Sequence, residues 1–357
     1  MALSIGIVGL PNVGKSTLFN ALTDANALAA NSPFATIEPN TGVVPIPDPR
    51  LEKLAKIYKT DKIVPATVTF VDIAGLVAGA SQGEGLGNQF LAHIRTTNAI
   101  AHVVRAFADS DVTKAGSSEP QKDIEIINTE LVLADLQTID RRLPRLEKEA
   151  KADPKLRPAL NNLLKTKRLL EGGTPLSASD EVDKELMSDL QLLSAKPVIY
   201  VFNVDEQALG EDDKKPELPL MISPAKALFV SAKLESELRG LDEKDRAELL
   251  ASYGQSKRGL EQLISSAYDV LGLQSFLTAG EKEVRAWTIP KGATAPEAAG
   301  VIHSDFQRGF IAAQVVDYDD LAMAGSLTAA RAAGKVRTEG KDYIMKPNDV
   351  VEFRFNV

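Results

Sequence analysis

Short apolar runs recur along the first three quarters of the chain, and each is followed by a polar or glycine-rich turn. The runs are typical of buried strands and cover residues 5–8, 66–71, 100–107, 197–202 and 228–230. Several of these runs are separated by stretches with helical spacing, so strands and helices alternate. This order predicts an α/β domain with a mostly parallel sheet.

One of these separating stretches is long and helical. Between residues 107 and 197, apolar side chains step by four and three residues, with a break at 152–154. The stepping positions are Val132, Leu136, Ile139, Leu143, Leu146, Leu156, Leu160, Leu163 and Leu170. Two short heptad arms around a proline-bearing turn predict an antiparallel coiled-coil hairpin, inserted at about residues 125–192.

The pattern changes again near residue 274. We expect a helix over 257–271 to close the first domain and residues 274–280 to form a linker. Strand patterns at 283–289, 309–316 and 350–355 then accompany a helix that begins near Ala295 and Pro296. We therefore divide the chain into a nucleotide-binding domain (1–274) and a β-grasp domain (275–357), in which Trp287 is a core residue.

The turn after the first strand carries the sequence G-L-P-N-V-G-K-S-T at residues 9–17. It matches the phosphate-binding pattern G-x-x-x-x-G-K-[ST], with a strand before it and a helix after it. Gly9 and Gly14 let the backbone curl, so that successive N–H groups and the helix N-terminus point inward. Lys15 should reach the β- and γ-phosphates, and the Ser16 hydroxyl should bind Mg²⁺.

Two further segments are expected to complete this site. Thr36, in the proline-containing loop that follows, should bind Mg²⁺ when a triphosphate is present, with Thr41 as the alternative. Asp72 ends the next strand and should hold Mg²⁺ through water, while the Gly75 N–H should contact the γ-phosphate. Leu76 stands where Ras-like enzymes have a water-orienting glutamine, so we expect slow intrinsic hydrolysis.

Asn12 is a candidate for a different contribution to catalysis. Its side-chain carbonyl in the phosphate loop can help to coordinate K⁺ beside the bridging oxygen of the β- and γ-phosphates. A cation there would supply positive charge as the bond breaks. The alternative is that Asn12 only stabilises the turn.

The order of motifs is that of a P-loop G-domain, but the segment that reads the base is altered. The usual N-K-x-D is replaced by N-V-D-E at 203–206, and S-A-K follows at 231–233. In guanine readers the aspartate accepts hydrogen bonds from the base, and the longer Glu206 cannot take its position. ATP is therefore at least as good a candidate as GTP, with Asn203 near the base N7 and the backbone around Val204 near the adenine amine.

Composition narrows the class of protein further. The 357 residues carry a net charge of −8 and no cysteine, which excludes disulfides and thiolate metal sites. The negative charge argues against DNA binding. We see no leader and no apolar run long enough to span a membrane, so we expect a cytoplasmic protein. The acidic surface and the covered elements favour a monomer.

Part of the predicted hairpin is basic, although the whole chain is acidic. Residues 141–168 contain ten Lys or Arg against three acidic residues. We hypothesise that this end of the hairpin contacts ribosomal RNA through charge. The alternative is an ordinary solvated coiled-coil face.

These motifs together resemble the Obg-like ATPases of the YchF type. The resemblance rests on the phosphate loop and on the sequences P-F-A-T-I-E-P-N-T-G-V-V, D-I-A-G-L-V and N-V-D-E. It extends to residues 285–296, which are similar to a TGS domain. It implies a preference for ATP over GTP, dependence on Mg²⁺, a cytoplasmic location and binding to ribosomes.

The resemblance also implies roles for individual residues. It places the Mg²⁺ ligands at Ser16 and Thr36 and a base contact at Val204. The implied ATP contacts are Asn12, Val13, Gly14, Lys15, Ser16 and Thr17. Some relatives carry a histidine in a mobile loop, and the corresponding loop here, near residues 109–118, has none.

We therefore expect a ribosome-associated switch that binds and slowly hydrolyses ATP. A GTPase of the same class is one alternative, because the topology and the S-A-K motif are those of GTPases. A nucleotide-gated binding module with incidental hydrolysis is the other.

Overall fold

The structure is a computed structural model, which describes residues 3–24, 40–73, 86–107, 119–211, 215, 217, 222 and 225–356. The chain forms two compact units. The first contains residues 1–44 and 69–271, and the second contains residues 45–68 and 272–357.

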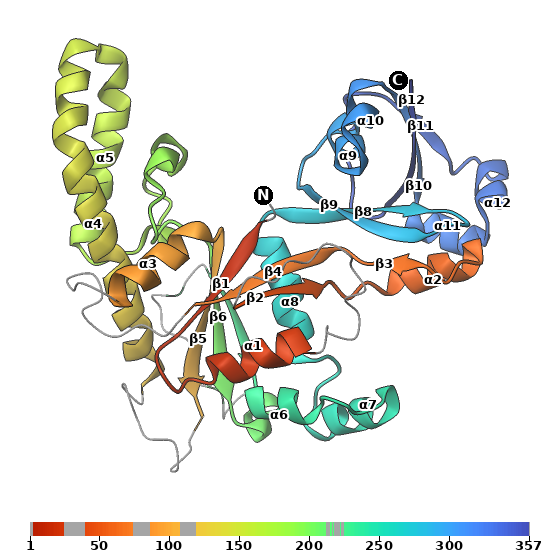
Figure 1. The fold of residues 1–357 in the computed structure, drawn as a ribbon, viewed down its shortest axis with the longest axis horizontal. Coiled ribbons are helices and arrows are strands. Elements are labelled where there is room, and N and C mark those ends of the chain that lie inside the picture. Colours follow the sequence, from red (N-terminus) through yellow and green to blue (C-terminus); the bar gives the residue numbers. More distant parts are fainter. Residues whose placement is uncertain are drawn as a thin grey trace. The chain divides into compact units, whose positions relative to one another are not determined.

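The first unit is built on a six-stranded sheet with the strand order β2-β4-β1-β5-β6-β7 (Figure 1). The pairs β4–β1, β1–β5, β5–β6 and β6–β7 are all parallel. The strands are β1 (Ser4–Val8), β2 (Thr41–Pro45), β4 (Thr67–Asp72), β5 (Ala99–Ala106), β6 (Val198–Val204) and β7 (Lys226–Val230). The predicted α/β class and mostly parallel sheet are therefore confirmed.

Helices connect these strands and cover the sheet, so its central strands are buried on both faces. Helix α8 contacts β5, β6 and β7, while α1 contacts α6. The helices are α1 (Lys15–Asp24), α3 (Leu86–Thr96), α6 (Ala232–Glu237), α7 (Glu243–Ser252) and α8 (Gly259–Val270). The Ser231 hydroxyl caps α6 by accepting from the Leu234 N–H at 3.3 Å.

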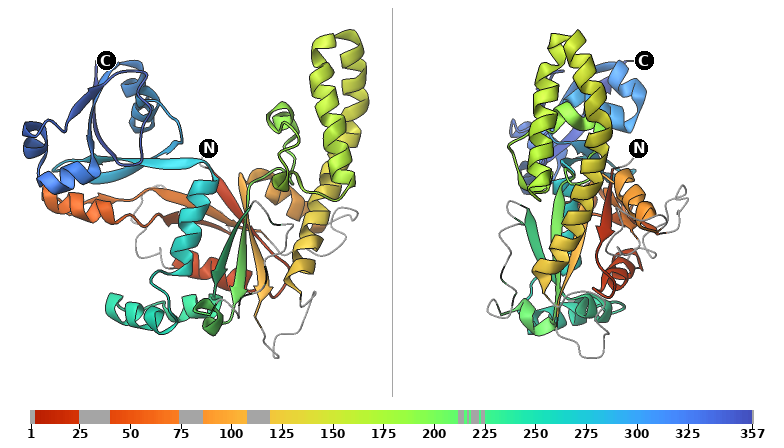
Figure 2. Two further views of the ribbon diagram at one scale, coloured as in Figure 1. Left: turned by 180° about the vertical axis from the view of Figure 1, so that it is seen from behind. Right: turned by 90° about the vertical axis from the view of Figure 1, so that its left-hand side faces the viewer.

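The predicted coiled-coil hairpin is present and consists of α4 (Pro120–Ala152) and α5 (Arg157–Glu171), which lie side by side (Figures 1 and 2). The break falls where the sequence predicts it, because Asp153 ends α4 and accepts from the Lys155 N–H at 3.0 Å. Every apolar position predicted for the seam belongs to a single hydrophobic cluster. Short 3₁₀ segments at Leu176–Ala178 and Glu185–Leu190 add Leu176 and Met187 to that cluster.

The second unit contains a six-stranded sheet with the order β11-β10-β12-β8-β9-β3. Its core forms where α9 packs against Phe276, Ile289 and Val315 of the sheet. The strands are β3 (Ile63–Val64), β8 (Leu273–Ala279), β9 (Val284–Pro290), β10 (Phe310–Asp317), β11 (Arg337–Glu339) and β12 (Asp349–Phe355). The helices are α2 (Pro49–Tyr58), α9 (Ala295–Ile302), α10 (Ser304–Arg308), α11 (Tyr318–Ala324) and α12 (Leu327–Ala332).

Trp287 is partly buried against this core, and its indole N–H donates to the Thr278 hydroxyl at 2.8 Å. The Arg285 guanidinium lies 3.9 Å from the centre of the Trp287 ring. Trp287 therefore packs at the edge of the core rather than within it, and it also lines a cavity.

Two details differ from the sequence analysis. Residues 274–280, expected to be a linker, are mostly strand β8, because their backbone pairs with β9 in an antiparallel ladder and Ser275, Phe276 and Leu277 are buried. Residues 45–68, placed in the nucleotide domain, belong to the second unit. Helix α2 packs on β8, β9 and α11, and β3 pairs with β9.

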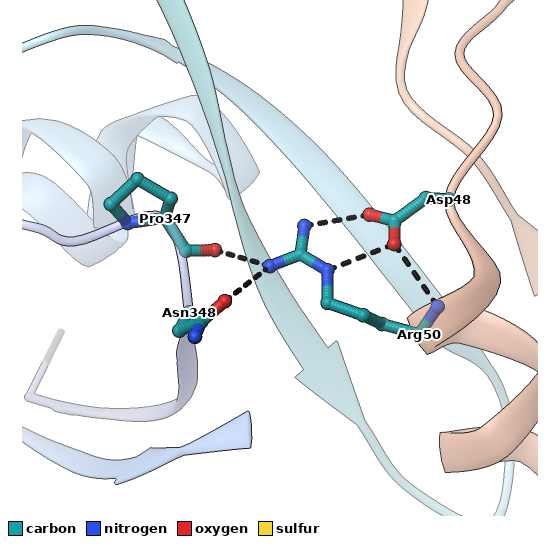
Figure 3. A network of polar contacts seen from close by, with 4 residues as sticks. All are labelled: Asp48, Arg50, Pro347 and Asn348. Atoms are coloured by element: carbon teal, nitrogen blue, oxygen red, sulfur yellow. Dashed lines mark hydrogen bonds and ion pairs between the residues drawn. The ribbon is translucent and has the colours of Figure 1, made fainter. Parts of the chain in front are cut away.

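Arg50 fixes this segment to the second unit (Figure 3). Its guanidinium donates to both carboxylate oxygens of Asp48, at 2.8 and 2.7 Å. It also donates to the Pro347 carbonyl at 2.6 Å and to the Asn348 side chain at 3.0 Å. These partners lie almost 300 residues apart in sequence, so a local pattern does not show them.

Candidate functional site

The loop between β1 and α1 has the curled backbone that its sequence predicts. Asn12 and Gly14 have left-handed backbone conformations, with φ of 63° and 91°. Asparagine tolerates this region better than most residues, and successive turned N–H groups form an anion-binding concavity. The Gly14 carbonyl then accepts from the Leu18 N–H at 3.0 Å, which begins the hydrogen bonding of the helix.

Both loop glycines are required by close packing. A Cβ atom at Gly9 would lie 2.8 Å from the Val103 carbonyl oxygen. A Cβ atom at Gly14 would lie 2.3 Å from the side-chain nitrogen of Asn203. Because both distances are shorter than van der Waals contact, a larger residue would force the loop away from its neighbours.

The loop lines a pocket of about 550 Å³. Lys15 and Asp72 form an ion pair within it, and their side chains are 10% and 18% exposed. β1 and β4 are parallel neighbours in which Ile7 pairs with Asp72, so both carboxyl ends reach the same edge. The other lining residues are Leu10, Pro11, Asn12, Gly14, Ser16, Thr17 and Asn40.

The donor groups of this pocket suit Mg²⁺. The Ser16 hydroxyl and the Asp72 carboxylate are hard oxygen ligands and share one pocket with the cationic Lys15. The Asp72 N–H donates to the Asn40 carbonyl at 2.8 Å, which fixes the strand end. Thr36 and Gly75 lie outside the described residues, whereas Thr41 begins β2 and is half-buried.

Asn203 links the phosphate loop to the S-A-K loop. Its side-chain NH₂ donates to the Val13 carbonyl at 3.0 Å, and its side-chain oxygen accepts from the Ala232 N–H at 2.9 Å. The side chain is buried, and one of its two amide hydrogens has no partner among the described residues. The sequence predicted only a contact between Asn203 and the base, and it did not predict the bond to Val13.

Val204 and Glu206 have different environments at the end of β6. The Val204 side chain is buried in the core, so only its backbone is placed to contact a base. The Glu206 carboxylate lies 2.7 Å from the Lys233 ammonium. Burial, the largest single effect, opposes ionisation of Glu206, but the hydrogen bond and charge of Lys233 together with a bond from the backbone N–H of Glu206 outweigh it and lower the Glu206 pKa. The sequence analysis missed this ion pair.

Comparison with known proteins gives the family. A family model described as a 50S ribosome-binding GTPase matches residues 4–134, and a model of the YchF GTPase C-terminal region, of unknown function, matches residues 273–356. The ribosome-binding ATPase YchF of Bacillus subtilis strain 168 is 48% identical over 366 residues, which cover all of both chains. The chain belongs to the YchF family.

Other members of the YchF family show the same full-length similarity. Ribosome-binding ATPases YchF from Pasteurella multocida and Escherichia coli O157:H7 are 50% and 49% identical, each over the whole of both chains. The solved structure of the Schizosaccharomyces pombe YchF GTPase matches with a TM-score of 0.87 at 38% identity, covering 99% of this chain and 97% of that one. The family resemblance identified from the motifs is confirmed.

The comparisons also bear on the whole fold. A YchF structure that aligns along nearly all of the chain shares its phosphate-loop domain and its C-terminal domain.

In the part of the chain that the structure describes, no helix has the length and apolar character needed to cross a membrane.

Proposed function

We propose that this YchF-family protein is a ribosome-associated switch that binds and slowly hydrolyses ATP. The observation that carries the proposal is the pocket in which a curled glycine loop brings Lys15, Ser16 and Asp72 together. The relatives that match over the full length are named ribosome-binding ATPases, which supports the same reading.

In this proposal the N–H groups of residues 12–17 hold the phosphate chain, and Lys15 stabilises the charge that develops as the γ-phosphate leaves. Ser16, Thr36 and Asp72 would hold Mg²⁺, which neutralises charge on the phosphate oxygens when bound. The Gly75 N–H is proposed to contact the γ-phosphate. Attack by water is in line with the bond that breaks.

The choice of ATP rests on Glu206, which is bound to Lys233 and replaces the aspartate of guanine readers. Asn203 and the backbone at Val204 are proposed to contact the adenine. A GTPase is the second candidate, because the solved S. pombe relative is described as a GTPase. A binding module with incidental hydrolysis is the third, and full cellular function of a Lys15→Ala variant would favour it.

We expect Lys15→Ala to lower ATP turnover by about a hundredfold or more, because it removes a fixed charge at the γ-phosphate. Phosphate release should be measured with ATP and GTP, with and without ribosomes, in K⁺ and in Na⁺. Faster hydrolysis in K⁺ would support the role of Asn12. The exposed Lys53→Ala is the control. Turnover of GTP alone would overturn the nucleotide assignment.

The partner surface is proposed to be the turn of the α4–α5 hairpin. Several of its cations are already neutralised, since Arg142 and Arg145 bind Glu149, and Lys167 binds Asp140. The exposed cations near the turn have no ion pair among the described residues, and these are Arg141, Lys148, Lys151, Lys155 and Arg157. Unpaired charge at the end of a rigid arm suits the phosphates of ribosomal RNA.

We expect the triple variant Lys151→Glu, Lys155→Glu and Arg157→Glu to weaken ribosome co-sedimentation by tenfold or more. It should also reduce the salt dependence of binding, because about three phosphate contacts are lost. The matched control makes the same charge change on the same unit, at Lys226, Lys244 and Lys257. Equal binding by both triple variants would contradict the role of the turn.

Location and assembly follow from this proposal. A protein that works on ribosomes acts in the cytoplasm, and the net charge of −8 agrees with RNA contact confined to one basic region and with no DNA binding. We propose that it acts as a monomer.

A further inference from the structure

Two side chains join the end of β6 and the loop that follows it to the first turn of α6, which begins just after the loop of β7. The side-chain oxygen of Asn203 accepts from the Ala232 N–H at 2.9 Å, and Glu206 binds Lys233 at 2.7 Å. β6 and β7 are parallel neighbours in which Asn203 pairs with Val230, so both loops begin at one edge of the sheet. The second bond is ionic, and it engages the residue that replaces the aspartate of guanine readers.

The two partners of this ion pair differ in exposure. The Glu206 side chain is 14% exposed, whereas the Lys233 side chain is 73% exposed. A largely enclosed carboxylate is costly unless hydrogen-bond donors reach it. Lys233 is the cation that meets this requirement from the solvent side.

The chemistry of the two bases makes this requirement relevant to nucleotide choice. Guanine presents donors at N1 and at its N2 amine, while adenine presents an acceptor at N1 and has no N2 amine. A carboxylate without a cation would gain donors from guanine and would face a lone pair of adenine. A carboxylate already bound to a lysine has less to gain from guanine.

We propose that Lys233 is a positioning residue for nucleotide choice, which holds Glu206 in an ion pair and so withholds its carboxylate from guanine. The inference rests on the proposed function at this site. It adds a reason for selectivity beyond the length of Glu206. Specificity is the difference between the affinities for two nucleotides, and Lys233 lowers the affinity for guanine by competing with it for the Glu206 carboxylate.

The test is displacement of a fluorescent ribose-labelled ADP by unlabelled ADP and GDP, with Mg²⁺ present. For Lys233→Met we expect the ratio of the GDP to the ADP dissociation constant to fall by about tenfold, as the freed carboxylate gains the donors of guanine. Lys233→Arg keeps the ion pair and should keep the wild-type ratio. A structural role for Lys233 would weaken both nucleotides equally and leave the ratio unchanged, which would overturn the inference.

Two further variants separate the mechanism from a general charge effect. In the double variant Lys233→Met and Glu206→Gln the fall in the ratio should disappear, because Lys233 acts through Glu206. Lys244→Met removes a lysine from an exposed ion pair with Glu248 and should leave the ratio unchanged. An equal fall in this control would overturn the inference. Wild-type protein that binds neither nucleotide would instead overturn the proposed function.

Discussion

At the scale of single residues, His102 and Asp123 are two buried ionisable side chains whose shifted pKa values contribute to the response of the protein to acid. His102 lies inside β5 with its ring 5.4 Å from that of Tyr200, and burial lowers its pKa to about 3. Neither ring nitrogen has a hydrogen-bond partner among the described residues. Burial raises the pKa of Asp123, in the first turn of α4, to about 6, although Arg105 opposes the shift.

We expect these two groups to act in opposite directions on the free energy of unfolding. As the pH falls from about 6.5 to 3, His102 should cost up to about 5 kcal/mol, because the unfolded imidazole takes a proton that the buried ring does not. Asp123 should add up to about 3 kcal/mol as the pH falls from about 6 to 3.8, because the folded state binds the extra proton.

Urea unfolding between pH 7 and 4.5 measures both effects. Relative to wild type, His102→Leu should lose less stability on acidification, and Asp123→Asn should lose more. Since the two variants should move in opposite directions, each serves as the control for the other. Parallel pH curves for all three proteins would contradict the assignment.

At the scale of elements, the hydrophobic contacts between α4 and α5 stabilise the hairpin, although one residue inside α4 disfavours a helix. Pro144 lies inside α4, is exposed, and cannot donate to the Asp140 carbonyl one turn earlier. In the same turn of α4, the Asp140 carboxylate lies 2.6 Å from the Lys167 ammonium of α5, beside the buried apolar side chains of the hairpin. Packing between the two helices therefore keeps residue 144 in a helical conformation that its local propensity disfavours.

We expect Pro144→Ala to stabilise the hairpin by up to about 3 kcal/mol, because it restores a backbone hydrogen bond and removes a steric conflict. Amide hydrogen exchange of residues 140–151 should slow. Lys148→Ala, an exposed substitution on the same helix, should change exchange by much less. Faster exchange in Pro144→Ala would show that the seam requires the proline.

At the scale of the whole molecule, the chain passes between its two units three times rather than once. Residues 45–68 connect β2 to β4, which ends at Asp72 of the candidate site, yet they fold with the second unit. Arg50 secures them there through a bidentate bond to Asp48 and bonds to Pro347 and Asn348. The bond to Asp48, which outweighs the effect of burial, raises the pKa of Arg50, so its charge is permanent.

We expect Arg50→Ala to destabilise the second unit by about 1–3 kcal/mol, because the Asp48 carboxylate and the Pro347 carbonyl lose their charged donor. Hydrogen exchange of α2 and β9 amides should accelerate. Arg50→Lys should rescue only in part, since an ammonium cannot form the planar fork. The exposed Lys53→Ala on the same helix is the control, and an equal effect there would contradict the role of Arg50.

The sequence by itself determined the features that depend on near neighbours in the chain. The curled loop at residues 9–17 follows from two glycines and an asparagine between a strand and a helix, and the hairpin seam follows from helical spacing around Pro154. The same motifs identified the family, and the fold class followed from the alternation of strands and helices. Each of these rests on local backbone preference or on periodicity, which a single sequence displays.

The tertiary structure decided which distant segments meet. It brought residues 45–68 to the second sheet, tied Asn203 to Val13, and paired Glu206 with Lys233. An amphipathic helix such as α2 shows that one face is buried but not which core buries it. Likewise, a charged residue after a strand finds its partner only when parallel pairing brings two strand ends to one edge, and that pairing depends on the whole sheet.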